Sequence, residues 1–277
     1  MIRDLVSPWL AAVEATDSTH ARSAFRARHA ALLEALRLTR TPALDALPLT
    51  TDQNQLRSLA RRAADPATQQ QLRDAIGQAT ALGADRCNTV TLLAGDASGT
   101  ASEPLFRPDP QAVLFVETGA KDHELTVALS GAIAALTRWS APSTPSVFAR
   151  TIAAARDRWE AARTVPLREW IYTEGVGLHL AAALLPDLPP YQLIGVHHAA
   201  FSRLREREKL FRALLDVDLD ERGVGLLLRW LTPGAALGPR TVGDVVLPPM
   251  TGRYLAWRMT ADRVERVGLR DALLAES

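Results

Sequence analysis

Apolar residues recur at helical spacing through the first third of the chain, with arginine and other polar residues on the opposite face. These stripes predict helices that begin near Leu5, Ala21, Gln53 and Pro66. Asp52 and Asp65 precede the last two stripes and are typical of helix N-caps, whereas Gly83 suits a left-handed residue at a helix C-terminus. Residues 1–86 are therefore expected to form an N-terminal helical region.

The hydrophobic period changes at Cys87. Short runs of β-branched and apolar residues, closed by glycine, predict strands over residues 88–95 and 112–118. Segment 124–139 fits two structures. Its alternating apolar residues, with Gly131 at a turn, predict a β-hairpin, whereas the same apolar residues also lie on one face of a helix. In that helix the glycine would cost about 1 kcal/mol. We favour the hairpin, so the expected sheet contains all three segments.

Helical spacing returns in the C-terminal half, where loops rich in proline and glycine separate the predicted helices. The expected helices span residues 146–164, 167–187, 191–215, 220–230 and 253–268. Together with the β-segments, this pattern predicts an α+β fold that is mostly helical.

The composition narrows the classes of function. Lys and Arg number 32 and Asp and Glu number 31, so the net charge is only +1. This balance argues against a nucleic-acid partner and against binding to an anionic membrane. The single cysteine, Cys87, rules out an intrachain disulfide and a cysteine-based zinc cluster. The first residues lack the layout of a signal peptide, and no apolar run reaches the roughly 18 residues of a membrane span, so we expect a cytoplasmic location.

Two short segments contain residues suited to catalysis, His123-Glu124 and Glu174–Gly177. A zinc peptidase of the thermolysin type carries H-E-x-x-H on a helix, so that both imidazoles bind one ion and the glutamate polarises its water. A later glutamate supplies the third ligand, a position that Glu174 would fill. The second histidine position holds Val127, whose side chain cannot bind a metal.

Several stretches resemble, in order, a bacterial family of predicted zinc-dependent proteases with the H-E-x-x-H signature. In that family a helix leads into a strand, which LRDAIGQATALGADRCNTVTLLAGD resembles, and a strand similar to VLFVETGA follows. The family's E-G-[LV]-[AG] motif matches Glu174–Gly177, and its G-x-Y-L-[GA]-[YW]-R helix matches Gly252–Arg258. The resemblance covers roughly residues 70–275 and implies a zincin-like domain over residues 87–277.

The resemblance can be aligned in two ways, and Glu174 matches the third metal ligand in both. In the first alignment, His123 and Glu124 match the first ligand and the catalytic glutamate. In the second, 124–139 is the family's hairpin and the metal helix is 146–164. Its signature positions then hold Arg150, Thr151 and Ala154. No histidine ligand and no general base remain in this second alignment, which fits better.

Both alignments imply a zinc site with too few ligands, because protein-bound zinc normally has three or four. We therefore expect a degenerate, non-catalytic protein without a cofactor, with a binding or regulatory role. Its former cleft, lined by Tyr254 and Trp257, is expected to bind a peptide or protein. One alternative is an active zinc peptidase with His123 and Glu174 as ligands and Glu124 as the catalytic residue. Another is a helical protein unrelated to peptidases, in which small residues of the E-G motif only permit close packing.

A buried carboxylate that has lost its cation needs a positive partner. We therefore expect Arg150 or Arg168 to pair with Glu174 in place of zinc. In the same fold the helix that follows residue 252 closes the cleft, so one of its aromatic residues should contact residues 170–185.

Overall fold

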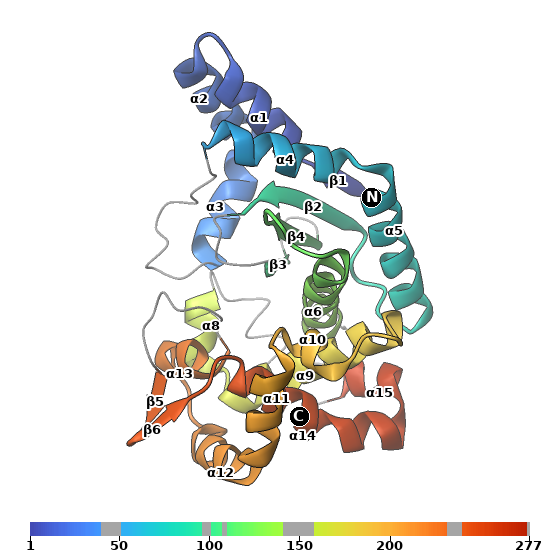
Figure 1. Cartoon of the computed structure of the whole chain (residues 1–277), viewed down its shortest axis with the longest axis vertical. Coiled ribbons are helices and arrows are strands. Elements are labelled where there is room, and N and C mark those ends of the chain that lie inside the picture. Colours follow the sequence, from blue (N-terminus) through green and yellow to red (C-terminus); the bar gives the residue numbers. More distant parts are fainter. Residues whose placement is uncertain (40–50, 96–100, 107–109, 141–157, 232–239, 276–277) are drawn as a thin grey trace.

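The computed structural model describes residues 1–39, 51–95, 101–106, 110–140, 158–231 and 240–275. The described chain is mostly helical, with one four-stranded mixed sheet and one two-stranded antiparallel hairpin (Figure 1). The predicted α+β class is confirmed at this level. No helix among these residues is long and apolar enough to cross a membrane.

The main sheet has the strand order β1-β2-β4-β3. Its strands are β1 Ile2–Asp4, β2 Thr89–Ala94, β3 Ala101–Leu105 and β4 Gln111–Val116. The first, second and fourth strands run parallel, and β3 pairs with β4 in the antiparallel direction. After their first residues β2 and β4 are fully buried, which is why both read as continuous apolar runs. These two strands confirm the predictions over 88–95 and 112–118.

The two edge strands lie in segments for which the sequence predicts no strand. β3 contains Pro104, which lacks an N–H for the ladder and is tolerated at a sheet edge. This strand is held by pairing with β4, and its Ser102 hydroxyl also donates a hydrogen bond of 2.6 Å to the Ala128 carbonyl. Tertiary contacts therefore specify β3 where local propensity does not.

The N-terminal helices lie within residues 1–86, and two of them begin at the predicted cap residues. They are α1 Val6–Glu14, α2 Ser18–Arg28, α3 Ala30–Thr39, α4 Gln53–Ala64 and α5 Pro66–Ala81. The Asp52 side chain accepts the Gln55 N–H at 2.9 Å, and the Asp65 side chain accepts the Thr68 N–H at 2.9 Å. Gly83 has a φ of 91°, as expected for the left-handed end of a helix. The predicted helix beginning near residue 21 is divided into α2 and α3.

The C-terminal helices and a short hairpin make up the lower half of the view in Figure 1. They are α6 Asp122–Ser140, α8 Arg158–Thr164, α9 Leu167–Leu184, α10 Pro190–Ile194, α11 His198–Glu206, α12 Glu208–Asp218, α13 Val224–Trp230, α14 Thr251–Val267 and α15 Leu269–Leu274, with the hairpin strands β5 Arg240–Val242 and β6 Val245–Leu247. The described part of the predicted helix 146–164 is α8. The predicted helix 191–215 is divided into α10, α11 and α12. Gly195 ends α10 with a φ of 83°, and Arg207 separates α11 from α12.

Segment 124–139 is helical, within α6, and the predicted hairpin is wrong. The helix is buried on almost every side from Leu125 to Trp139, so it lacks the polar face by which a helix is recognised in a sequence. Its apolar residues therefore also fit the alternating pattern of a strand. Gly131 is not a turn. It lies against Gly177 of α9, whose Cβ, if it had one, would be 3.1 Å from the Gly131 Cα.

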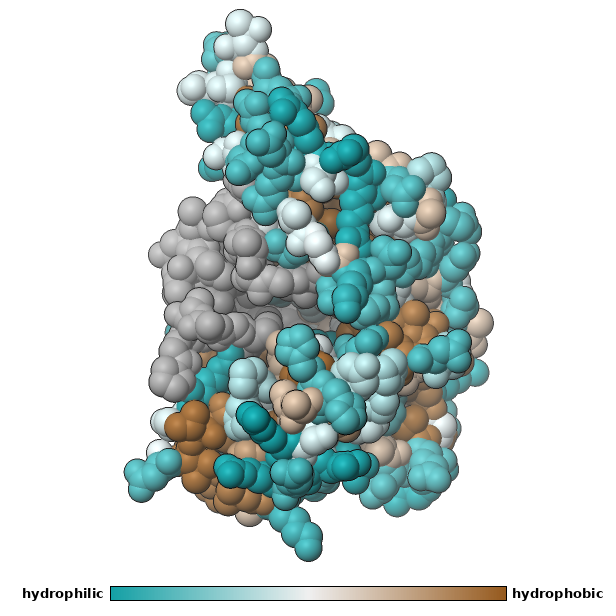
Figure 2. All heavy atoms as spheres, viewed as in Figure 1, coloured by the Kyte–Doolittle hydropathy of each residue, from teal (hydrophilic) through white to brown (hydrophobic). Residues whose placement is uncertain are grey.

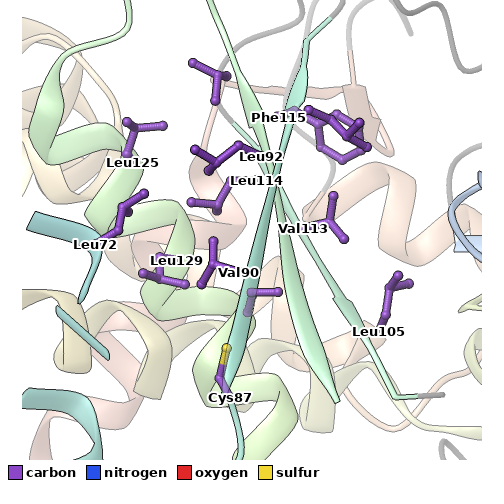
Figure 3. Close-up of a cluster of buried hydrophobic side chains, with 14 of the residues drawn as sticks. Leu72, Cys87, Val90, Leu92, Leu105, Val113, Leu114, Phe115, Leu125 and Leu129 are labelled. Carbon is purple, nitrogen blue, oxygen red and sulfur yellow. The ribbon is translucent and has the colours of Figure 1, made fainter. Parts of the chain in front are cut away.

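α6 covers one face of the sheet (Figure 3). Leu114 of β4 points to the same side as Leu125 and Leu129 of α6, and Val113 and Phe115 point to the other side. This alternation follows from the period of two along a strand. The sheet and α6 thus share one hydrophobic core.

The described residues form two large hydrophobic clusters. The first joins the sheet to the N-terminal helices, and the second lies among the C-terminal helices. Both α6 and α9 contribute to each cluster, so these two helices connect the halves of the molecule. The expected boundary after residue 86 falls within the first cluster, which contains residues from both sides of it.

Polar residues cover most of the surface visible in Figure 2. Apolar residues gather in a patch at the lower left, where the β5–β6 hairpin and α12 lie, and in a second area on the right. Val246 of the hairpin is 60% exposed and Val217 of α12 is 76% exposed.

Replacing Gly175 with alanine should lower the free energy of unfolding by about 1–3 kcal/mol, the range for overpacking. A Cβ there would lie 2.3 Å from the Ala256 carbonyl oxygen and 2.4 Å from the Thr260 Oγ1 of α14. The matched control is Gly77→Ala in α5, where a Cβ meets nothing within 4 Å. It should raise stability by about 1 kcal/mol through helix propensity. Urea unfolding measures both, and equal effects would contradict the close α9–α14 contact.

Candidate functional site

α9 carries the E-G motif and packs between α6 and α14. Gly175 faces α14 and Gly177 faces α6, and the missing side chains let both neighbours approach the α9 backbone. Glu174 lies on the part of α9 that faces α14. The motif therefore fixes the position of its own carboxylate between two closely packed helices.

The Glu174 carboxylate forms an ion pair with Arg253 of α14, with 2.9 Å between Oε1 and Nε. The Nε–H does not point at the oxygen as a hydrogen bond requires, so the attraction is that of two charges in contact. The side chains are 32% and 24% exposed, which makes the pair half-buried. The predicted positive partner is thus present, but it comes from α14.

Of the two expected partners of Glu174, only Arg168 lies among the described residues, and that expectation is wrong. Arg168 pairs with Asp220 at 2.5 Å, because it lies in the first turn of α9 and faces the chain that follows α12. Arg150 lies outside the described residues, as do Thr151 and Ala154, the other signature positions of the second alignment.

His123 and Glu124 lie in the first turn of α6, far from Glu174. Because Gly131 lies against Gly177, and α6 and α9 run antiparallel, Glu174 is level with a point about eleven residues beyond His123, or about 16 Å along the helix. Glu124 has a structural contact instead, since its Oε2 accepts the Lys121 N–H at 3.0 Å and caps the helix. Among the residues that the structure describes, no three His, Cys, Asp or Glu side chains group as a metal site.

The two aromatic residues expected at the cleft differ in exposure. Trp257 is half-buried, and its carbonyl accepts a 3.0 Å hydrogen bond from Nε2 of His179 on α9, which confirms the predicted contact with residues 170–185. Tyr254 is only 1% exposed and donates a 2.5 Å hydrogen bond to Glu208. Burial and this bond raise the pKa of Tyr254. It is therefore a core residue and does not line an open cleft.

Sequence reasoning missed a second ion pair, between Arg138 of α6 and Glu169 of α9, with 2.9 Å between Nη2 and Oε2. Both side chains are 4% exposed. The Arg138 Nε donates to the Thr173 hydroxyl at 3.0 Å, and Nη1 donates to the Ala275 carbonyl beyond α15 at 2.6 Å. Its guanidinium carbon also lies 4.4 Å from the centre of the Tyr172 ring. The one signal in the sequence is an arginine within a long apolar segment.

No family model matches this chain, and no curated protein or solved structure matches it. The resemblance to zinc-dependent proteases therefore rests on the motifs of the sequence alone.

Replacing Arg138 with methionine should lower the free energy of unfolding by about 3–5 kcal/mol, because it leaves the Glu169 carboxylate buried without its cation. Arg168→Met is the matched control, since that arginine pairs on the surface with a 77% exposed aspartate. Its loss should be below about 1 kcal/mol. Chemical unfolding followed by circular dichroism compares them, and similar losses would show that the α6–α9 pair contributes no more than a surface pair.

His179 should make the fold less stable in mild acid. Burial lowers its pKa from the usual 6.5, and the bond to the Trp257 carbonyl offsets this only in part. Below about pH 6.5 the unfolded chain therefore takes up a proton that the folded chain resists, so stability falls until the pH reaches the lowered pKa. His29 has a lowered pKa too, through burial and then the charges of Arg3 and Arg28.

Urea unfolding between about pH 7.5 and pH 5 measures this loss. His179→Gln should reduce the slope of stability against pH in that range, and His20→Gln is the control, because His20 is exposed on α2. An unchanged slope in His179→Gln would show that His179 does not cause the loss of stability in acid.

Proposed function

We propose that this chain is a non-catalytic protein with the helix arrangement of a zinc peptidase, and that it acts by binding a peptide or protein. The observation that carries the proposal is the Glu174–Arg253 ion pair. The glutamate that matches the third zinc ligand has a guanidinium 2.9 Å from its carboxylate oxygen, where the peptidase would have a metal.

The neighbours of Glu174 support the loss of the metal. Zinc in proteins normally has three or four ligands from the chain, and Glu174 is separated from His123 by about 16 Å of helix. His179 is one turn further along α9, but its Nε2 is used in the bond to the Trp257 carbonyl. Neither histidine is thus placed to complete a zinc site with this carboxylate.

The side chains around the pair suit recognition of a partner. Trp257 stacks beside His179 with ring centres 6.4 Å apart, and Phe201 of α11 lies 6.2 Å from the same indole. All three rings are half-buried. Partly exposed aromatic rings next to a charged pair are the composition of many peptide and protein interfaces.

Metal analysis tests the proposal. Protein purified without chelator and then dialysed should contain far less than one zinc per chain by mass spectrometry, and should release no peptides from casein with or without added zinc. Zinc bound near one per chain, and lost in both His123→Ala and Glu174→Gln, would overturn the proposal in favour of an active peptidase. Asp220→Asn is the control for a nonspecific loss of surface charge.

A further inference from the structure

The site proposed above has two half-buried aromatic rings at its surface, Phe201 of α11 and Trp257 of α14. Their ring centres lie 6.2 Å apart, and the Tyr254 ring lies 5.6 Å from the first and 6.4 Å from the second. In Figure 1 α11 lies near the front of the molecule, between α10 and α12. We call Phe201 and Trp257, with Arg205 and Arg258 beside them, the aromatic face.

Tyr254 supports the two rings from below. It is 1% exposed, and its hydroxyl donates a hydrogen bond of 2.5 Å to Glu208 of α12. The Phe201 ring meets the Tyr254 ring nearly edge-on, at 84°. Aromatic rings that are already packed lose little conformational entropy when a partner binds on them. The aromatic face is therefore a preformed surface for an apolar side chain.

Helix geometry places Arg205 next to the rings. It follows Phe201 by four residues, so the two side chains lie on the same face of α11. Burial and the Glu208 carboxylate raise the pKa of Tyr254, whereas the charges of Arg258 and Arg205 lower it. Arg205 is thus close enough for its charge to act on the Tyr254 hydroxyl, and it is itself exposed.

The two arginines of the aromatic face differ in their counter-charges. Arg258 has its Nε 3.2 Å from Oε2 of Glu208, and its guanidinium carbon lies 5.9 Å from the centre of the Trp257 ring. Within the ranges that the structure describes, Arg205 has no ion pair. Glu208 does not supply one, because its carboxylate is bonded to Tyr254 and Arg258. The Arg205 guanidinium is therefore available to a group that binds on the rings.

The stretch of chain around Arg205 is positive overall. Residues 203–209 contain four basic and two acidic side chains, whereas the net charge of the whole chain is only +1. Of the two acids, Glu208 is already paired with Arg258. The other, Glu206, lies about 140° around an ideal helix from Phe201 and so faces away from the rings. The charge beside the rings is positive, which complements a carboxylate.

An acidic peptide fits this arrangement better than a nucleic acid does. A nucleic-acid strand requires a series of cations that follow its phosphates. On the aromatic face, in the described part of the chain, Arg205 is the one arginine without a counter-charge. A peptide with one carboxylate next to an apolar side chain matches this single cation and the two rings.

We propose that the aromatic face binds an acidic peptide segment, which packs an apolar side chain on Phe201 and Trp257 and pairs a carboxylate with Arg205. The carboxylate of an aspartate or glutamate meets a planar guanidinium with two parallel hydrogen bonds. This inference rests on the proposed function, because it names the class of partner for the same site.

Selection from a phage-displayed library of random short peptides tests the proposal. Peptides that bind the wild-type protein should be enriched in aspartate and glutamate together with an apolar or aromatic residue. Enrichment of neutral or basic peptides would overturn the acidic partner and leave the proposed function in place. If no peptide is enriched, the proposed function fails as well.

Fluorescence anisotropy then measures the affinity of the most enriched peptide. Arg205→Gln should weaken binding about tenfold, the effect of losing a charged hydrogen bond. Replacing the acidic residues of the peptide with their amides should weaken binding to the wild-type protein similarly and add little in the Arg205→Gln variant. Arg203→Gln is the matched control, because Arg203 is exposed on the same helix but lies about 160° around it from Phe201, and it should leave the affinity unchanged.

Circular dichroism establishes that both variants are folded, as expected for exposed side chains. Two further results would overturn the proposal. One is equal weakening by Arg205→Gln and Arg203→Gln, which would indicate general attraction to surface charge. The other is tighter binding of a labelled oligothymidylate than of the peptide, lost in Arg205→Gln, which would indicate a nucleic-acid partner.

Discussion

The Arg138–Glu169 ion pair lies where three helices meet, and the rest of the C-terminal half is arranged around it. Two charges with 4% exposed side chains are costly to remove from water, and they are tolerated only when their hydrogen bonds are satisfied. Here the guanidinium reaches Thr173 on α9 and the Ala275 carbonyl beyond α15, as well as Glu169. Any shift of α6 along α9 would break several of these bonds together. The pair therefore fixes the register of the two helices that connect the hydrophobic cores.

Glycines then set how closely the helices approach once the register is fixed. Gly177 brings α9 onto α6, Gly175 brings it onto α14, and Gly252 brings the start of α14 within contact of the Trp230 carbonyl. All three belong to the motifs that carry the resemblance to zinc-dependent proteases. In this chain these motifs therefore specify how closely the helices pack. Glu174, the remaining polar member of the E-G motif, is left with Arg253 as its counter-charge.

The sequence predicted those parts of the fold that depend on interactions between residues close together in the chain. The Asp52 and Asp65 caps, the apolar runs of β2 and β4, and helix α14 were all predicted. α6 was not, because a helix buried on every side loses the polar face that distinguishes it from a strand. β3 was not predicted either, because its conformation comes from pairing with β4. Both failures have the same origin, since tertiary packing overrode the local pattern.

For the candidate site, the sequence predicted the charge of the partner of Glu174 but not which residue supplies it. A positive partner was expected for the Glu174 carboxylate, and one is present. Arg253 was not predicted as this partner, because the sequence does not say which distant helix lies beside α9, and Arg253 is far from Glu174 along the chain. Arg138 gave a usable signal, as a charge inside an apolar segment, but the choice of a hairpin for that segment concealed its role.

We propose that the Arg253 guanidinium takes the place of a metal at Glu174. Anomalous X-ray diffraction at the zinc absorption edge, from crystals grown with zinc chloride, would detect a metal bound there. We expect no anomalous peak at zinc–carboxylate distance, about 2.0–2.2 Å, from the Glu174 oxygens, with Arg253 still beside them. A peak at that distance, with Arg253 displaced, would show that Glu174 binds zinc and that the proposal is wrong.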